Sequence, residues 1–189
     1  GWPVRRDGAE PGDHVWVTGA LGAAAAAVRA WEGGEEPSPA LRSAFVKPVA
    51  RVNEARCLVE HEIVDAMIDV SDGLVGDAGH IAAASGVKIV LDLGDIPVAE
   101  EARHALGSEA ALQAALTGGE DYELCFITDP GIVDPGYFLE RYGVAVTRVG
   151  SVSDGDGVWL RAEDGSVTRA TSGGFDHWEA PAASDEAGT

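Results

Sequence analysis

The chain has 189 residues and a formal net charge of −19, with 32 acidic residues against 13 Lys and Arg. This excess of negative charge disfavours nucleic acid and anionic membranes as partners. No apolar run is long enough to span a bilayer. The two cysteines, Cys57 and Cys125, lie in apolar segments, which is typical of a reduced, cytoplasmic protein. A chain of this length can bury one sizeable core, so we expect one main domain.

The first part of the chain predicts a linker, a strand and two helices. Residues 1–13 are rich in Gly, Pro and charge and are expected to be an entering linker. Residues 14–18 alternate as a half-buried strand, and an alanine-rich helix covers 23–31. The next helix is expected to begin at Lys47-Pro48. Its buried face would comprise Val49, Val52, Ala55, Leu58 and Val59, and its wet face Arg51 and Arg56.

Residues 66–74 are predicted to pass from an apolar strand, through a polar turn, into a helix. The strand covers 66–70, and an apolar stripe with helical spacing runs over 74–85 and stops at Gly86. Ser71 and Asp72 are residue types that cap a helix N-terminus, where free backbone N–H groups favour an anion.

The two carboxylates of this turn, Asp69 and Asp72, would repel a phosphate unless a divalent cation lay between them. Mg²⁺ is usually held by one or two carboxylates together with phosphate oxygens and water, so the turn favours a magnesium-phosphate site. An ordinary cap beside a solvated strand end would produce the same short pattern, and both interpretations stay open at this point.

A second unusual stretch covers residues 117–126, with the sequence T-G-G-E-D-Y-E-L-C-F. Tyr122, Leu124 and Phe126 alternate with Glu123 and Cys125, which predicts a strand that begins near Tyr122. Paired glycines before a strand allow a ligand to approach the backbone closely, but an ordinary turn has the same pattern.

The remaining elements follow from periodicity and turn signals. Strands are predicted at 87–92, 144–149, 158–161 and 166–169, and helices at 109–116 and 136–142. Two aromatic residues, Phe175 and Trp178, flank a histidine after a double glycine, and the small polar residues of 181–189 are expected to form a disordered tail.

These stretches, in this order, resemble one family, the thiamine-monophosphate kinases of the aminoimidazole-ribonucleotide-synthetase-like superfamily. The resemblance covers about residues 1–180 and is to the C-terminal domain, so that 14–180 would be the kinase domain. The pair D-x-S-D-G-L and G-G-E-D-Y-E-L is more specific than either motif alone. The matching positions are 6–9, 11–13, 17–22, 47–48, Arg51, 67–74, Asp77, 80–81, 118–124 and 174–178.

The resemblance implies a three-layer α/β (α+β) sandwich on a mixed, largely antiparallel sheet, and an enzyme that transfers a phosphoryl group from ATP to thiamine monophosphate with Mg²⁺, making thiamine diphosphate. Phosphoryl transfer needs positioning and charge neutralisation and no protein nucleophile. The implied roles are metal ligands for Asp69 and Asp72, nucleotide contacts for Ser71 and Arg6, and thiamine contacts for Glu120, Phe175 and Trp178. We expect Glu120 and the acidic turn to open onto one cleft.

Two features depart from the family. Ala23 replaces an acidic residue that usually follows the first Gly-rich turn. In the family, an N-terminal domain holds ATP and most of the metal cluster and forms a homodimer, and nothing in this chain corresponds to it. The chain also lacks an initiator Met. We therefore expect a fragment that is inactive alone. The alternatives are a relative of the selenophosphate-synthetase, hydrogenase-maturation or purine-cyclase type, or a non-catalytic ligand-binding or assembly domain.

Overall fold

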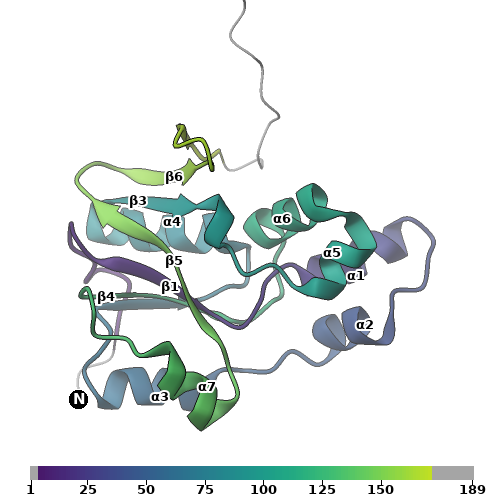
Figure 1. Ribbon diagram of the computed structural model, residues 1–189, viewed down its shortest axis with the longest axis horizontal. Helices are drawn as coiled ribbons and strands as arrows, with labels where there is room; N and C mark the ends of the chain where they lie inside the picture. The colour runs from purple at the N-terminus through teal and green to yellow at the C-terminus, as the bar shows by residue number, and fades with distance from the viewer. Residues whose placement is uncertain (1–3, 172–189) are drawn as a thin grey trace, which may run out of the picture.

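The computed structural model describes residues 4–171, in which seven strands form one sheet (Figure 1). The strands are β1 (His14–Thr18), β2 (Ala66–Asp69), β3 (Lys88–Asp92), β4 (Leu124–Thr128), β5 (Val146–Ser153), β6 (Gly157–Arg161) and β7 (Val167–Arg169). Their order across the sheet is β2-β4-β1-β5-β3-β6-β7. Only β3 and β6 pair in parallel, so the sheet is mixed and largely antiparallel, as predicted.

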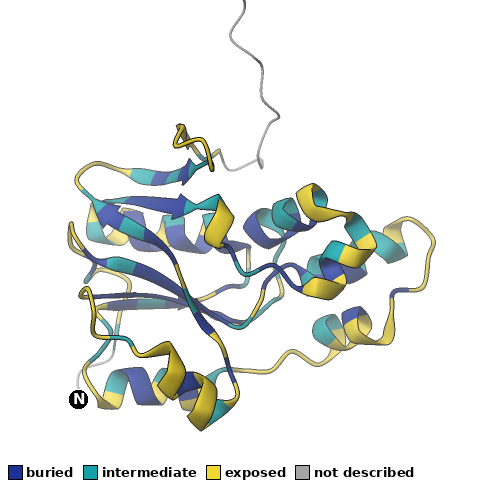
Figure 2. Cartoon of the chain, in the orientation of Figure 1, coloured by how far each residue is buried: buried dark blue, intermediate teal, exposed yellow. Residues whose placement is uncertain are grey.

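Helices cover both faces of this sheet. They are α1 (Ala23–Glu32), α2 (Pro39–Val46), α3 (Val52–Glu60), α4 (Leu74–Ser85), α5 (Glu100–Leu106), α6 (Ser108–Thr117) and α7 (Pro135–Tyr142), with a short 3-10 helix η1 (Leu93–Asp95). Buried residues of α1, α2, α4, α5 and α6 join one large core cluster, whereas α3 and α7 contribute to a second, smaller one. Figure 2 shows the buried sides of these helices turned toward the sheet.

Strand β1 shows how alternating side chains separate the two clusters. Val15 and Val17 belong to the large cluster, and Trp16 between them belongs to the small one. The Trp16 ring stacks on that of Phe126 from β4, with 6.5 Å between centroids. A sheet with a core on each face and helices outside both cores is a three-layer sandwich, which confirms the expected fold class.

The segment between α2 and α3 corrects one prediction. Residues 39–46 form a helix that the sequence analysis missed, begun by Pro39 and capped by Ser38, and no helix begins at Lys47-Pro48. Pro48 disfavours the helical backbone at Lys47, which has φ −139° and ψ 62°. Helix α3 starts only at Val52, so Val49 and Val52 are 64% and 59% exposed instead of buried.

Strand β5 also differs from its prediction, because it continues through Gly150 to Ser153. Val15 pairs with Gly150 and Trp16 with Arg148, so one residue of β5 is left over and the register shifts there. Such a bulge keeps a strand in the sheet past a glycine that the sequence pattern marks as a stop.

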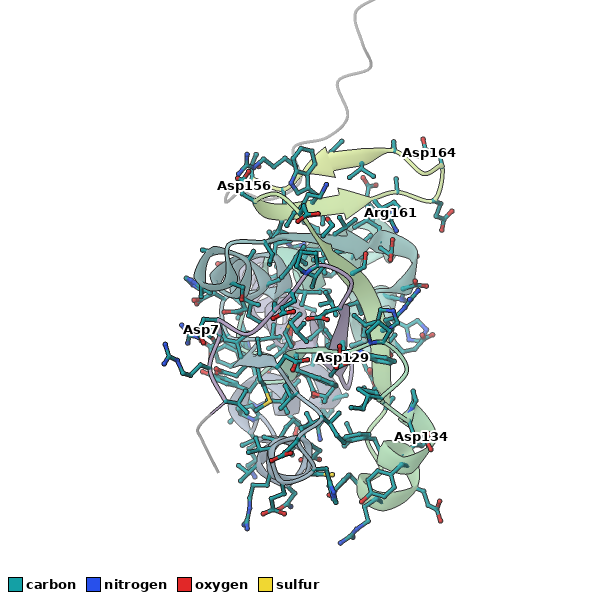
Figure 3. The ribbon with its side chains drawn as sticks, turned by 90° about the vertical axis from the view of Figure 1, so that its left-hand side faces the viewer. Asp7, Asp129, Asp134, Asp156, Arg161 and Asp164 are labelled. Carbon is teal, nitrogen blue, oxygen red and sulfur yellow. The ribbon has the colours of Figure 1, made fainter. Side chains whose placement is uncertain are left out.

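The described part of residues 1–13 runs beside the edge strand β2. Arg5 forms a parallel bridge with Ala66, and the N–H of Met67 donates to the carbonyl of Arg5 at 3.0 Å. The tail at 181–189 lies outside the described residues. No helix among residues 4–171 combines the length and apolar character needed to cross a membrane. Exposed acidic side chains occupy surface turns, as Figure 3 shows for Asp129, Asp134, Asp156 and Asp164.

Candidate functional site

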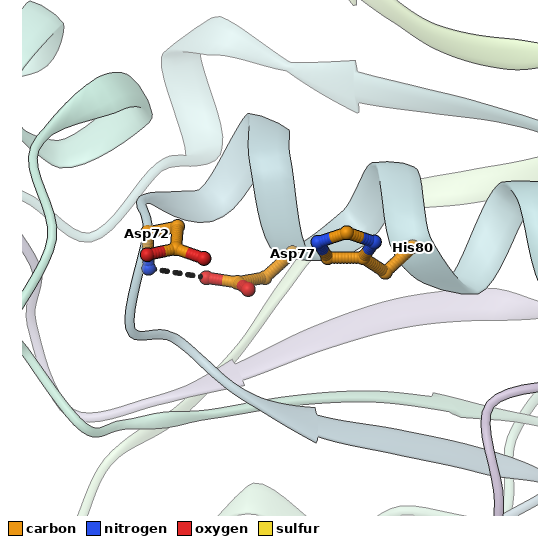
Figure 4. A group of neighbouring side chains, drawn as sticks. All are labelled: Asp72, Asp77 and His80. Carbon is orange, nitrogen blue, oxygen red and sulfur yellow. Dashed lines mark hydrogen bonds between the residues drawn. The ribbon is translucent and has the colours of Figure 1, made fainter.

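Residues 69–73, here called the acidic corner, connect β2 to α4. The carboxylate of Asp77, in the first turn of α4, accepts the backbone N–H groups of Ser71 and Asp72, both at 2.9 Å. Asp77 is buried, and burial raises its pKa although these two hydrogen bonds act in the opposite direction. Figure 4 shows the Asp72 backbone joined to Asp77, with His80 one turn further along α4. Asp77 therefore fixes the shape of the corner from inside.

Residues 118–123, here called the glycine corner, connect α6 to β4. Glu120 and Tyr122 have φ angles of 71° and 52°, which L residues rarely adopt. For this reason the strand begins at Leu124 and not near Tyr122 as predicted. A Cβ on Gly119 would lie 2.0 Å from the carbonyl oxygen of Ser71, so this position accepts only glycine without a shift.

The two corners are hydrogen-bonded to each other. The N–H of Glu120 donates to the Ser71 carbonyl at 3.0 Å, and the N–H of Tyr122 donates to the Val70 carbonyl at 2.9 Å. In return, the N–H of Val70 donates to the Glu123 carbonyl at 2.7 Å. The structure thus brings together the two stretches that the sequence analysis singled out, 43 or more residues apart in the chain, because β2 and β4 pair antiparallel with Asp69 opposite Leu124.

The Tyr122 hydroxyl interacts with three carboxylates of the two corners, one by a hydrogen bond and two by charge alone. The Tyr122 hydroxyl donates to Glu120 at 3.0 Å. The pKa of Tyr122 is raised, first by this hydrogen bond and by the charge of Glu120, and further by burial and by the charges of Asp69 and Asp72. Glu120, Asp69 and Asp72 therefore all lie within electrostatic range of the Tyr122 hydroxyl.

Within the described part of the chain, Asp69 and Asp72 both present unengaged carboxylates at the acidic corner. Both are exposed, and neither carboxylate has a hydrogen bond or ion pair with any residue between 4 and 171. Their carboxylate oxygens are therefore unengaged within this range, and oxygen is the ligand type that Mg²⁺ prefers. One oxygen each of Asp72 and Asp77 and a His80 ring nitrogen also lie within 4.8 Å of one another, but the Asp77 carboxylate is already engaged by the two backbone amides.

The remaining predicted site residues fall into two groups. Arg6 and Asp69 line one cavity of about 600 Å³, together with Met67, Ile68 and Leu124. The Ser71 hydroxyl has no hydrogen bond to another residue within the described part of the chain. Phe175 and Trp178 lie outside the described residues.

The sequence analysis missed two features under the glycine corner. Asp121 accepts the N–H of Gly22 at 2.8 Å and so caps α1, and burial raises its pKa to about 6. Arg51, which was expected on a wet helix face, instead forms an ion pair with Glu123 at 2.6 Å. One signal was present: Glu123 and Cys125 share the face of the predicted strand opposite Leu124, and a carboxylate beside a buried position needs a partner.

Comparison with known proteins places the chain in a family. Residues 10–162 match the AIR synthase related protein, C-terminal domain. The chain belongs to this family. Within it, the thiamine-monophosphate kinase of Salmonella typhimurium is 34% identical over 190 residues, which is 96% of this chain and 57% of the relative. The chain thus spans little more than half the length of this relative.

Solved structures agree with this family assignment. The thiamine-monophosphate kinase of Stenotrophomonas maltophilia K279a has a TM-score of 0.79 and 38% identity, over 87% of this chain and 54% of that chain. A complex of AaThiL with AMPPCP and TMP has a TM-score of 0.74 and 33% identity, over 93% of this chain and 54% of that chain. The AIR synthase related domain described here therefore resembles the corresponding part of thiamine-monophosphate kinases, as the two motifs indicated.

Proposed function

We propose that this chain is the C-terminal part of an ATP-dependent kinase that converts thiamine monophosphate to thiamine diphosphate. The identities to thiamine-monophosphate kinases support this reaction. The solved complex with AMPPCP and TMP supports ATP and thiamine monophosphate as the ligands. The whole activity would require the part of the relatives that this chain does not span, and we propose a homodimeric, cytoplasmic enzyme.

One observation carries the proposal: the acidic corner and the glycine corner are joined backbone to backbone. Glu120 bonds to Ser71, and Tyr122 bonds to Val70, so a molecule at Glu120 is also beside Asp69 and Asp72. A phosphoryl transfer site needs this juxtaposition, because the charge-neutralising groups and the acceptor must be held in one orientation.

The predicted site residues would then have the following tasks. Asp69 and Asp72 would hold Mg²⁺, which when bound neutralises charge on the phosphates. The free Ser71 hydroxyl would donate to a phosphate oxygen, and Arg6 would contact the nucleotide from the cavity it shares with Asp69. Glu120 would attract the cationic thiamine ring system, with Phe175 or Trp178 as an aromatic wall.

The test is phosphoryl transfer by a chimera in which this chain replaces the matching part of the Stenotrophomonas maltophilia kinase. Asp72→Asn is expected to lower kcat about tenfold or more, because charge neutralisation acts in the transition state. Glu120→Ala is expected mainly to raise KM for thiamine monophosphate, because it removes a binding contact. Glu140→Ala, an exposed carboxylate on α7, is the matched control and should behave as the parent chimera does.

Two outcomes would contradict the proposal. A chimera that folds and binds AMPPCP but does not phosphorylate thiamine monophosphate would exclude this substrate. A chimera that keeps full activity in both variants would show that Asp72 and Glu120 do not have the proposed roles.

A further inference from the structure

Arg51 and Glu123 form a buried, two-pronged ion pair beneath the glycine corner. The Nε and Nη2 atoms of Arg51 donate to the two carboxylate oxygens of Glu123 at 2.7 and 2.6 Å. The two side chains are only 17% and 8% exposed. Because withdrawing both charges from water is unfavourable, a pair of this kind is weak evidence for stability alone, and its geometry suggests a role in fixing a structure.

A third group fixes the position of the Glu123 carboxylate. The Thr18 hydroxyl, at the end of β1, donates to it at 2.6 Å and accepts the backbone N–H of Leu124 at 2.9 Å. Arg51 also forms a longer ion pair with Glu54 of α3, with 4.0 Å between Nη1 and Oε1. The carboxylate is therefore held from two directions, by β1 and by the segment that precedes α3.

Glu123 lies three positions after Glu120, at the end of a strained stretch of backbone. Glu120 and Tyr122 both have positive φ angles, which cost free energy and persist only when the surroundings impose them. On the ligand side, the bonds to Ser71 and Val70 impose this shape. On the opposite side, side-chain bonds within the described residues hold the corner at two points: Asp121 accepts the N–H of Gly22, and Glu123 is bound by Arg51 and Thr18.

We propose that Arg51 is a positioning residue for substrate binding: through the Glu123 carboxylate it keeps Glu120 in the orientation that contacts the thiamine part of the substrate. This inference rests on the proposed function. A purely structural tie of the 47–51 segment is the alternative, and it would leave the backbone at Glu120 unaffected.

The first test needs no enzymatic activity. Amide hydrogen exchange is measured by NMR on the 189-residue chain and its Arg51→Lys and Arg51→Met variants. Lysine keeps the charge but cannot form the two-pronged contact. We expect the Glu120 and Tyr122 amides to exchange at least about tenfold faster in Arg51→Lys, while the interior of α4 exchanges as before. Arg56→Met, on the exposed face of α3, is the control and should change neither amide.

The second test separates positioning from general damage in the chimera described above. Arg51→Lys is expected to raise KM for thiamine monophosphate about tenfold and to leave KM for ATP within about twofold. Because Arg51 acts through Glu120, this effect should disappear when Glu120 is already alanine.

Two results would overturn the inference. One is unchanged exchange at Glu120 and Tyr122 in both Arg51 variants, and the other is a KM effect that simply adds to that of Glu120→Ala. A chimera that never phosphorylates thiamine monophosphate would refute the proposed function instead, and the exchange measurement would still decide whether Arg51 shapes the corner.

Discussion

The carboxylates in and beside the two corners differ in their surroundings, and these differences determine what each can do. Asp69 and Asp72 are exposed and unpaired within residues 4–171, so their oxygens are free for a ligand. Asp77 and Asp121 are engaged by backbone N–H groups, and Glu123 is paired with Arg51. Sequence alone gives all five the same chemistry, because burial and partners depend on residues far away in the chain.

Asp121 predicts a pH dependence of stability. Its pKa is about 6 in the folded chain, raised mainly by burial and also by the charge of Glu123, against 3.8 without these effects. The native state therefore binds this proton more tightly than the unfolded chain, and its contribution to stability is lost as the pH rises from about 4 through 6. The other charged groups that line the pocket of about 370 Å³ beside Asp121 are Lys47, Arg51 and Glu123.

Asp121→Asn isolates this effect, because an amide oxygen can still accept the N–H of Gly22. The difference in the free energy of unfolding, variant minus wild type, is expected to increase by about 2 to 3 kcal/mol from pH 4 to pH 7, because only wild type loses the Asp121 contribution. Urea denaturation of both proteins across this range measures the difference, and other titrating groups cancel in it. A difference that stays constant with pH would contradict the prediction.

At the level of elements, local pattern predicted most helices and strands, and long-range contacts explain where it did not. The stripes over 14–18 and 74–85 depend on neighbours in sequence, and both elements form as expected. The segment at 47–51 has helical spacing too, but Pro48 disfavours the helical backbone at Lys47, and Arg51 is bonded to Glu123 of the glycine corner instead of lying on a helix face. Tyr122 alternates like a strand residue, yet its bond to Val70 turns the backbone away.

Glycine substitutions distinguish a contact between elements from a local preference. Gly119→Ala places a Cβ 2.0 Å from the Ser71 carbonyl, so the corners must separate, and we expect a loss of about 2 kcal/mol or more in the free energy of unfolding. Gly76→Ala, inside α4, meets only the Asp72 Cβ at 3.7 Å and should stabilise by about 0.5 to 1 kcal/mol. Denaturant unfolding measures both, and equal effects of the two substitutions would contradict the proposed packing of the corners.

At the scale of the whole molecule, the sheet order explains why the site exists. The end of β2 and the start of β4 pair antiparallel, and the end of β1 lies beside β4 on its other edge. The acidic corner, the glycine corner and Thr18 are thereby gathered at one end of three adjacent strands. The motifs predicted which residues matter, but strand order, which joins them, follows from tertiary pairing that no local pattern encodes.

The same arrangement predicts how the whole chain responds to magnesium. An ion that binds the folded corner but not the unfolded chain stabilises the fold, by about 2.7 kcal/mol at 100 times its dissociation constant. At constant ionic strength, adding Mg²⁺ should therefore raise Tm of the 189-residue chain. Part of any increase could come from screening of the net charge of −19.

The double variant Asp69→Asn with Asp72→Asn separates these two contributions. It removes both free carboxylates and leaves Asp77, which shapes the corner, in place. We expect the increase in Tm with Mg²⁺ to be larger for wild type than for this variant. The control is Asp129→Asn with Asp164→Asn, two exposed carboxylates outside both corners (Figure 3), which should respond as wild type does. Equal increases in all three proteins would show that Mg²⁺ acts only on the overall charge, and the acidic corner would then not be a metal site in this chain.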